Sequence, residues 1–165
     1  MSAEADDPGT SLLFDVFATS QAVGRLLAAA MRGGPLTPPE YAVASAIFEL
    51  EAAAPTALAA RLGMPLTTLA DQVRAFEARG LVRRLPHPTD GRSYRLVLTA
   101  TGREAHLAAN AGFEAAHRAF SAALPAGEDR ARVGLADVRI AAEAAEAAAA
   151  GEVVTSPRRS RDRGG

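Results

Sequence analysis

Polar and basic side chains gather in two short stretches near the middle of this 165-residue chain. The first stretch contains Thr67 and Thr68, followed by Gln72 and Arg74. Hydroxyl, amide and guanidinium groups of this kind can hydrogen-bond to phosphate oxygens or to the edges of nucleic-acid bases. The second stretch carries four arginines: Arg83, Arg84, Arg92 and Arg95. The chemistry that the two stretches share is the recognition of a polyanion.

The local sequence pattern predicts the elements that position the first group. Residues 56–62 form a short helix with Thr56 as its cap, Gly63-Met64-Pro65 forms a tight turn, and residues 66–79 form a second helix that ends at Gly80. Pro65 suits the entry to this second helix. Thr67 and Thr68 then lie in its first turn, where free backbone N–H groups attract anions. The alternative for both threonines is plain helix capping.

A β-hairpin is predicted after the second helix, with strands at 81–85 and 94–98. The prediction rests on β-branched and aromatic content and on the turn Pro88-Thr89-Asp90-Gly91. It does not rest on alternation, because the positions of interest do not all fall on one alternating set: Val82, Arg84, Tyr94, Leu96 and Leu98. Arg92 stands near the hairpin tip, where a guanidinium can enter the minor groove, and Asp90 can orient it. Helix, tight turn, helix and basic hairpin together predict a winged helix-turn-helix, whose second helix enters the DNA major groove.

The charge is distributed unevenly along the chain. The formal net charge is −1, but residues 55–103 contain eight arginines and three acidic residues, so this part carries +5 and the remainder −6. A basic region on an acidic body is typical of a protein that docks a polyanion. Several of these arginines also have a second interpretation. Arg74 can pair with Asp71 three residues before it. Either phosphate contact or pairing with local acids is expected for Arg83, Arg84 and Arg95.

Helices are predicted on both sides of this unit, in a mainly helical fold. The expected organisation is a disordered segment at 1–9, an N-terminal dimerisation helix in 10–36, the winged lobe at 37–99, C-terminal dimerisation helices in 100–150 and a disordered basic tail at 151–165. A capping box at Thr37-Pro38-Pro39-Glu40 begins a helix that runs to about Ala53, and Thr99 caps a long helix. The flanking helices are apolar on one face, so we expect them to pack together and against a second chain. No boundary between domains is expected.

The composition argues against several classes of protein. The chain has no cysteine, which excludes disulfides and thiolate metal sites. No window approaches the ~20 apolar residues of a membrane span, and the acidic N-terminus lacks the features of a signal peptide, so we expect a cytoplasmic protein without membrane contact. No paired carboxylates, phosphate loop or nucleophile–base spacing indicates an enzyme or a cofactor. His106 and His117 share a helix face without further ligands, which favours core or seam positions over a metal site.

The ordered set of motifs resembles the MarR family of bacterial transcriptional regulators. The motifs are Thr56–Pro65, Thr67-Thr68-Leu69, Phe76–Arg84, Asp90-Gly91-Arg92 and Leu98-Thr99-Ala100-Thr101-Gly102, preceded by Leu36–Tyr41. The resemblance implies a homodimer that binds double-stranded DNA at a near-palindromic operator, as a repressor. Asp71 and Leu66 depart from the family pattern, because polar or basic residues are common at these two positions.

The resemblance also implies release of the DNA by a small aromatic or phenolic molecule held between the dimerisation layer and the DNA-binding lobe. Candidate contacts for such an effector, chosen by side-chain chemistry alone, are Phe17, Tyr41, Phe48 and His106. Core packing is the alternative for each of them. The alternative function is a winged-helix protein-interaction module that no longer binds DNA, which Asp71 and the low net charge favour and the Arg92 hairpin disfavours.

Overall fold

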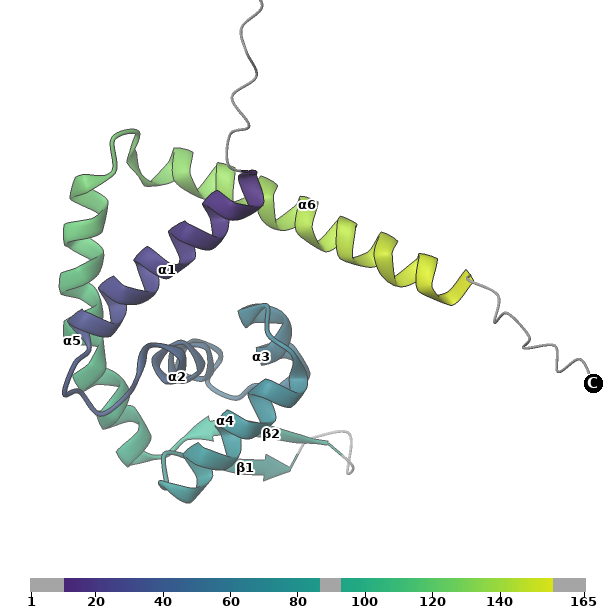
Figure 1. Cartoon of the computed structure of the whole chain (residues 1–165). Helices are drawn as coiled ribbons and strands as arrows, with labels where there is room; N and C mark the ends of the chain where they lie inside the picture. The colour runs from purple at the N-terminus through teal and green to yellow at the C-terminus, as the bar shows by residue number, and fades with distance from the viewer. Residues whose placement is uncertain (1–10, 87–92, 156–165) are drawn as a thin grey trace, which may run out of the picture. The chain divides into compact units, whose positions relative to one another are not determined.

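The computed structural model describes residues 11–86 and 93–155, and in these residues it contains six helices and one two-stranded antiparallel sheet (Figure 1). The predicted mainly helical fold with a small hairpin is confirmed. The chain divides into two compact units, with the division between Arg118 and Ala119. The sequence predicted no such boundary, because it falls inside a continuous helix.

The first unit contains the elements of the winged lobe together with the helices that flank it. They are α1 (Leu12–Ala30), α2 (Pro38–Leu50), α3 (Pro55–Leu62), α4 (Leu66–Ala78), β1 (Val82–Pro86), β2 (Tyr94–Leu98) and most of α5 (Ala100–Ala123). The second unit contains the end of α5 and α6 (Gly127–Thr155), which extends past the predicted end near residue 150.

The core of the first unit lies between α2, α3, α4 and the hairpin. Its most deeply buried large side chains are Val43, Ile47, Leu58, Leu69, Phe76 and Leu96. Leu69, Val73 and Phe76 recur at helical spacing on α4, so one face of this helix is buried and the opposite face is left to solvent. The core therefore fixes which α4 side chains can meet a ligand.

The ends of α2 and the start of α3 have local causes. Glu40 accepts hydrogen bonds from the Thr37 backbone N–H at 2.8 Å and from its hydroxyl, as the capping box predicts. α2 ends at Leu50 rather than near Ala53, because Glu51 adopts a φ of +56°. The prediction that Thr56 caps α3 is wrong. Proline is suited to the first helical position, so Pro55 takes it and Ala54 is the cap.

The strand register shows that the sequence-based interpretation of the hairpin residues was wrong, because they do share one alternating set. Val82 pairs with Leu98, Arg84 with Leu96 and Pro86 with Tyr94, so these side chains lie on one face of the hairpin. β2 also pairs on its other edge, since the backbones of Ala53 and Leu96 exchange hydrogen bonds of 3.1 and 2.8 Å. The segment that leads into α3 is thereby tied to the hairpin.

The motif Leu98-Thr99-Ala100-Thr101-Gly102 joins the hairpin to α5. The Thr99 hydroxyl donates to the Gly80 carbonyl at 2.6 Å and accepts from the Gly102 N–H at 3.0 Å, which confirms Thr99 as the cap. A Cβ atom on Gly102 would lie 1.9 Å from the Leu81 carbonyl oxygen. Only glycine permits this approach of α5 to the start of β1.

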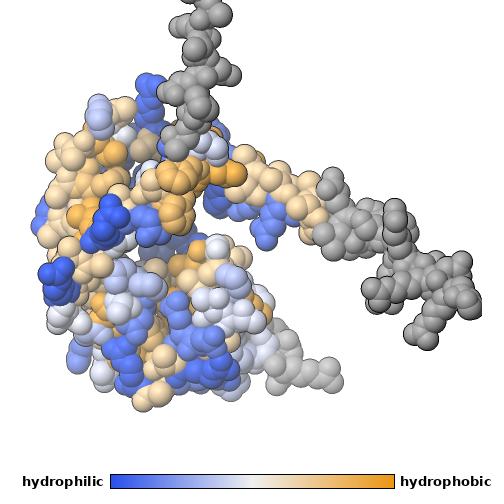
Figure 2. Space-filling model, in the orientation of Figure 1, coloured by the Kyte–Doolittle hydropathy of each residue, from blue (hydrophilic) through white to orange (hydrophobic). Residues whose placement is uncertain are grey.

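α1 is the least buried helix of the first unit. Its N-terminal half exposes Leu12, Leu13, Phe14 and Phe17, and hydrophobic atoms lie on the surface over it (Figure 2). With 19 residues, α1 is long and apolar enough to cross a membrane by length and composition alone, contrary to the sequence-based expectation. Its C-terminal end instead packs on α5, where a Cβ on Gly112 would lie 2.6 Å from the Ala30 carbonyl oxygen.

Candidate nucleic-acid interface

The exposed face of α4 carries the polar residues that the sequence singled out. Gly63, at a φ of +61°, ends α3, and Pro65 is the cap residue that precedes α4. Thr67 and Thr68 follow in the first turn, and both are exposed. Neither hydroxyl is used as the helix cap, because the cap position belongs to Pro65. Both hydroxyls and the first N–H groups of α4 are therefore available to an anion.

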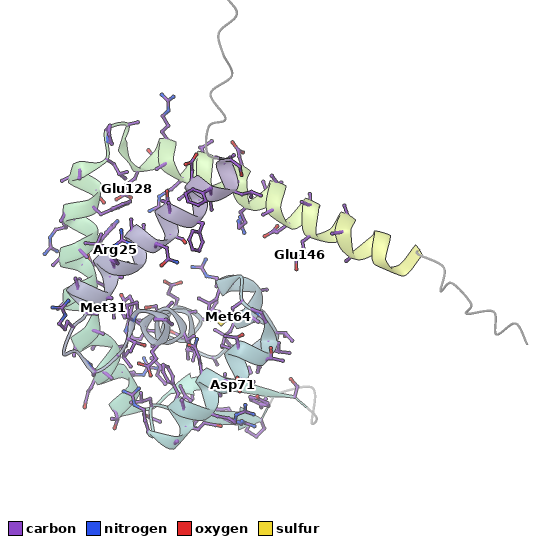
Figure 3. The ribbon with its side chains drawn as sticks, viewed as in Figure 1. Arg25, Met31, Met64, Asp71, Glu128 and Glu146 are labelled. Carbon is purple, nitrogen blue, oxygen red and sulfur yellow. The ribbon has the colours of Figure 1, made fainter. Side chains whose placement is uncertain are left out.

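Asp71 and Arg74 form an ion pair on the same exposed face, and Asp71 projects from α4 in Figure 3. The pair is the i, i+3 arrangement that the sequence offered as an alternative for Arg74. Gln72 is half-buried rather than exposed, and its Oε1 atom has no hydrogen-bond partner among the described residues. The Arg74 guanidinium is thus exposed on this face with its charge neutralised by Asp71, whereas the Gln72 side chain is partly turned toward the protein.

Replacing Asp71 with asparagine is expected to strengthen duplex binding about tenfold at low salt. The change removes a carboxylate from the exposed face and releases Arg74 to neutralise a phosphate, so the slope of log affinity against log salt should steepen by about 0.9. Fluorescence anisotropy with a labelled duplex measures both quantities. Asp137→Asn, on the exposed surface of α6, makes the same charge change away from α4 and should leave them unaltered. Weaker binding by Asp71→Asn would assign Asp71 to base recognition instead.

The arginines of the hairpin differ in how free their guanidinium groups are to contact a ligand. Glu77 holds Arg84 through two hydrogen bonds of 2.6 and 2.9 Å, and the guanidinium lies 4.4 Å from the centre of the Tyr94 ring. The hydrogen bond to Glu77 is the main cause that raises the pKa of Arg84. Arg95 is half-buried, and within residues 11–86 and 93–155 its buried Nε atom has no hydrogen-bond partner. Asp90 and Arg92 lie outside the described residues.

Two further ion pairs compensate arginines of the basic region. Arg61 pairs with Glu49 at 2.8 Å, and Arg79 pairs with Glu40 at 2.6 Å. Both acids lie on α2, outside the basic stretch, so the local excess of positive charge is smaller than the sequence count. The sequence could not show this, because the partners are 12 and 39 residues apart.

Leu66 is a surface residue of this interface that the sequence analysis treated only as a departure from the family pattern. Its side chain is 48% exposed at the first position of α4. It borders a cavity of about 350 Å³ between the α3–α4 pair and β2, which Leu69, Val73 and Tyr94 also line. The interface is thus apolar on the flank of α4 that faces the hairpin.

A second cavity, of about 260 Å³, lies between α1, α2 and α5 within the first unit. Its lining consists of Leu27, Met31, Pro38, Tyr41, Ala42, Ser45, Glu49 and Phe113. Met31 lies where α1 ends beside α5 (Figure 3). Tyr41, Ser45 and Glu49 are spaced four residues apart on α2. That spacing is a signal in the sequence that could have identified Ser45 and Glu49 as lining residues.

An aromatic stack adjoins this cavity. The His106 ring lies between those of Tyr41 and Phe48, with centroid distances of 5.3 and 4.6 Å, and its Nε2 atom is 3.1 Å from the Ser45 hydroxyl. Burial lowers the pKa of His106, and its Nδ1 atom has no hydrogen-bond partner in the described part of the chain. Of the four predicted effector contacts, Tyr41 lines the cavity, His106 and Phe48 stack beside it, and Phe17 is 58% exposed elsewhere on α1.

Comparison with known proteins finds chains of similar sequence and fold. Residues 36–94 match the family model described as MarR family. The HTH-type transcriptional regulator TtmR of Methylorubrum extorquens is 33% identical over 101 residues, which is 59% of this chain and 52% of the relative. The chain therefore spans about half the length of the curated relative that it matches.

Two solved structures share most of the fold. The transcriptional regulator MosR of M. tuberculosis, in complex with DNA, is 26% identical with a TM-score of 0.73, covering 82% of this chain and 98% of that one. The PcaV transcriptional regulator of Streptomyces coelicolor, in complex with its natural ligand, is 28% identical with a TM-score of 0.69, covering 88% and 99%.

Proposed function

We propose that this chain is a transcriptional regulator of the MarR type, which its partial match to that family model supports, and that it binds double-stranded DNA as a homodimer and represses transcription. α4 enters the major groove of a near-palindromic operator, and the hairpin carries Arg92 into the adjacent minor groove. The dimer forms through the exposed apolar surface of α1 and the C-terminal helices. Its place of action is the cytoplasm, and it acts as a regulator rather than an enzyme.

The observation that carries this proposal is the pair of exposed hydroxyls at the start of α4. Thr67 and Thr68 follow a left-handed glycine and a cap proline that fix the direction of the helix, while Leu69 beside them is completely buried. A rigid helix whose N-terminal turn projects hydroxyls and free N–H groups supports phosphate and base contact. The MosR relative, which shares this fold at 26% identity, is in complex with DNA in its solved structure.

A protein-interaction module is the alternative. The observation in its favour is that Arg61, Arg74, Arg79 and Arg84 are each paired with an acidic side chain of this chain. The two functions differ in their response to salt. A DNA-binding protein loses duplex affinity steeply as salt rises, because each neutralised phosphate releases counterions. Weak binding with no salt dependence would support the interaction module.

Replacing Arg92 with alanine is expected to weaken binding to a duplex selected from a random pool by about tenfold, since one minor-groove contact is lost. The dimer should persist in sedimentation or light scattering, because the proposed dimer surface lies on α1 and the C-terminal helices rather than at the hairpin tip. Arg103→Ala, in the first turns of α5, removes an equal charge away from the hairpin tip and serves as the control. Unchanged affinity of the Arg92 variant would remove the hairpin tip from DNA recognition.

A small effector that releases the DNA is the remaining part of the proposal. The cavity between α1, α2 and α5 supports it, since it is lined by apolar and aromatic side chains with a few polar groups. The PcaV relative, at 28% identity, is in complex with a natural ligand in its solved structure. An aromatic molecule bound beside Tyr41 would contact α1, α2 and α5 together, and so would change how the terminal helices hold the winged lobe.

A further inference from the structure

We propose that the cavity between α1, α2 and α5 selects a small aromatic cation, with Glu49 as the partner of its positive group. The inference deepens the proposed effector site and rests on it, because it names the charge of the molecule that the site takes.

The lining favours a flat apolar body that carries one positive charge. Leu27, Met31, Pro38 and Phe113 provide apolar walls, and the Tyr41 ring provides an aromatic one. Among the described residues that line this cavity, Glu49 is the single charged one. With a volume of about 260 Å³, the cavity accepts one ring with a short substituent. A cation on that substituent also gains from the negative faces of the aromatic rings.

The hydroxyl groups of Tyr41 and Ser45 in this cavity already make hydrogen bonds within the chain, which disfavours an anion. The Tyr41 hydroxyl donates to the Asn110 Oδ1 atom at 2.5 Å, and the Ser45 hydroxyl lies 3.1 Å from the His106 Nε2 atom. A carboxylate or phenolate that bonded to Tyr41 or Ser45 would compete with these contacts, and one that bonded to Arg61 would have to displace the Glu49 carboxylate. A buried anion without donors carries a large desolvation cost.

The electrostatic field inside the cavity also disfavours an anion. Burial raises the pKa of the Tyr41 hydroxyl, and the carboxylates of Glu114 and Glu49 raise it further, although its contact with Ser45 lowers it. Two carboxylates thus act against negative charge at the position of the Tyr41 oxygen. The same field stabilises a positive group at that place.

The ion pair of Glu49 links this cavity to the helix-turn-helix. The Glu49 Oε2 atom accepts from Arg61 of α3 at 2.8 Å, and both side chains are more than half exposed. An exposed pair contributes little to stability, so its partner exchanges readily. A cation that takes Glu49 competes with Arg61 and weakens the attachment of α3 to α2. Binding is thereby coupled to the helix that precedes the recognition helix.

Three probes of nearly equal size and shape test the charge: benzamidine, benzamide and benzoate, which are cationic, neutral and anionic at pH 7. Isothermal titration and ligand-detected NMR with the full chain should show the order benzamidine, benzamide, benzoate, with at least tenfold between the first and last. Equal or tighter binding of benzoate overturns the proposal, and so does the absence of binding by all three. Duplex binding without any probe is measured separately, so a failure of the proposed function is distinguished from a failure of this inference.

Single-residue variants test whether Glu49 is the partner of the positive group. Glu49→Gln should weaken benzamidine binding at least tenfold and leave benzamide binding unchanged, whereas Glu104→Gln, on the exposed face of α5, should alter neither. Arg61→Ala should tighten benzamidine binding severalfold, because the competing guanidinium is gone. Circular dichroism checks that each variant is folded. Equal benzamidine affinity in the native chain and in Glu49→Gln overturns the role of Glu49, and unchanged affinity in Arg61→Ala overturns the competition.

Discussion

Replacing Gly102 with alanine is expected to destabilise the first unit by roughly 3 kcal/mol, at the upper end of the usual cost of overpacking. The added Cβ would lie 1.9 Å from the Leu81 carbonyl oxygen and 2.9 Å from its carbon, so rigid backbone rather than a flexible side chain must move. The melting temperature should fall by about 6 to 12 °C. Thermal unfolding followed by circular dichroism at a fixed protein concentration measures the change.

Gly24 provides the matched control, because it is also a helical glycine of the first unit and nothing lies within 4 Å of a Cβ placed on it. Gly24→Ala should be neutral or stabilise by about 0.5–1 kcal/mol, as alanine does in a helix. If the two variants lowered the melting temperature equally, the close approach of α5 to β1 would not be the cause.

Replacing Thr67 with glutamate is expected to reduce duplex affinity at least a hundredfold at low salt. The substitution removes a hydroxyl donor and brings a carboxylate toward phosphates, and like charges held together at an interface cost several kcal/mol. The helix itself should remain intact, since an acidic residue in the first turn interacts favourably with the helix dipole. Fluorescence anisotropy with the selected duplex measures the loss.

Thr101→Glu is the control for this prediction. Thr101 is exposed in the first turn of α5, so the same chemical change and the same charge are introduced away from α4. Its effect on affinity should be less than threefold. A comparable loss in both variants would mean that net charge, rather than the position of Thr67 on α4, governs binding.

Much of the winged lobe could be predicted from local sequence, because its signals lie within a few residues of the structure they cause. Gly63 ends α3, Pro65 precedes α4, and Thr99 caps α5 through bonds to adjacent backbone. The spacing of Leu69, Val73 and Phe76 fixes the buried face of α4, so the exposure of Thr67 and Thr68 follows from it.

The remaining features depend on residues far apart in the chain. Tyr41 bonds to Asn110 across 69 positions, and Glu49 to Arg61 across 12, so no local pattern identifies these partners. The face that the hairpin residues share was predicted wrongly for another reason. It follows from which residues pair across the two strands, such as Arg84 with Leu96, and not from the sequence of either strand alone. Prediction of Phe17 as an effector contact rested on chemistry only, and its ring lies against Phe14 instead of in the cavity lining.

The double hydrogen bond between Ala53 and Leu96 gives the lobe a mechanical property. β2 lies between β1 on one side and the short segment before Pro55 on the other, so the entry to α3 and the hairpin share one backbone ladder. A rotation of α3 would therefore strain backbone hydrogen bonds that hold β2, in addition to any side-chain contacts. If the chain binds DNA as proposed, the segment that enters α3 and the hairpin would therefore be expected to change position together.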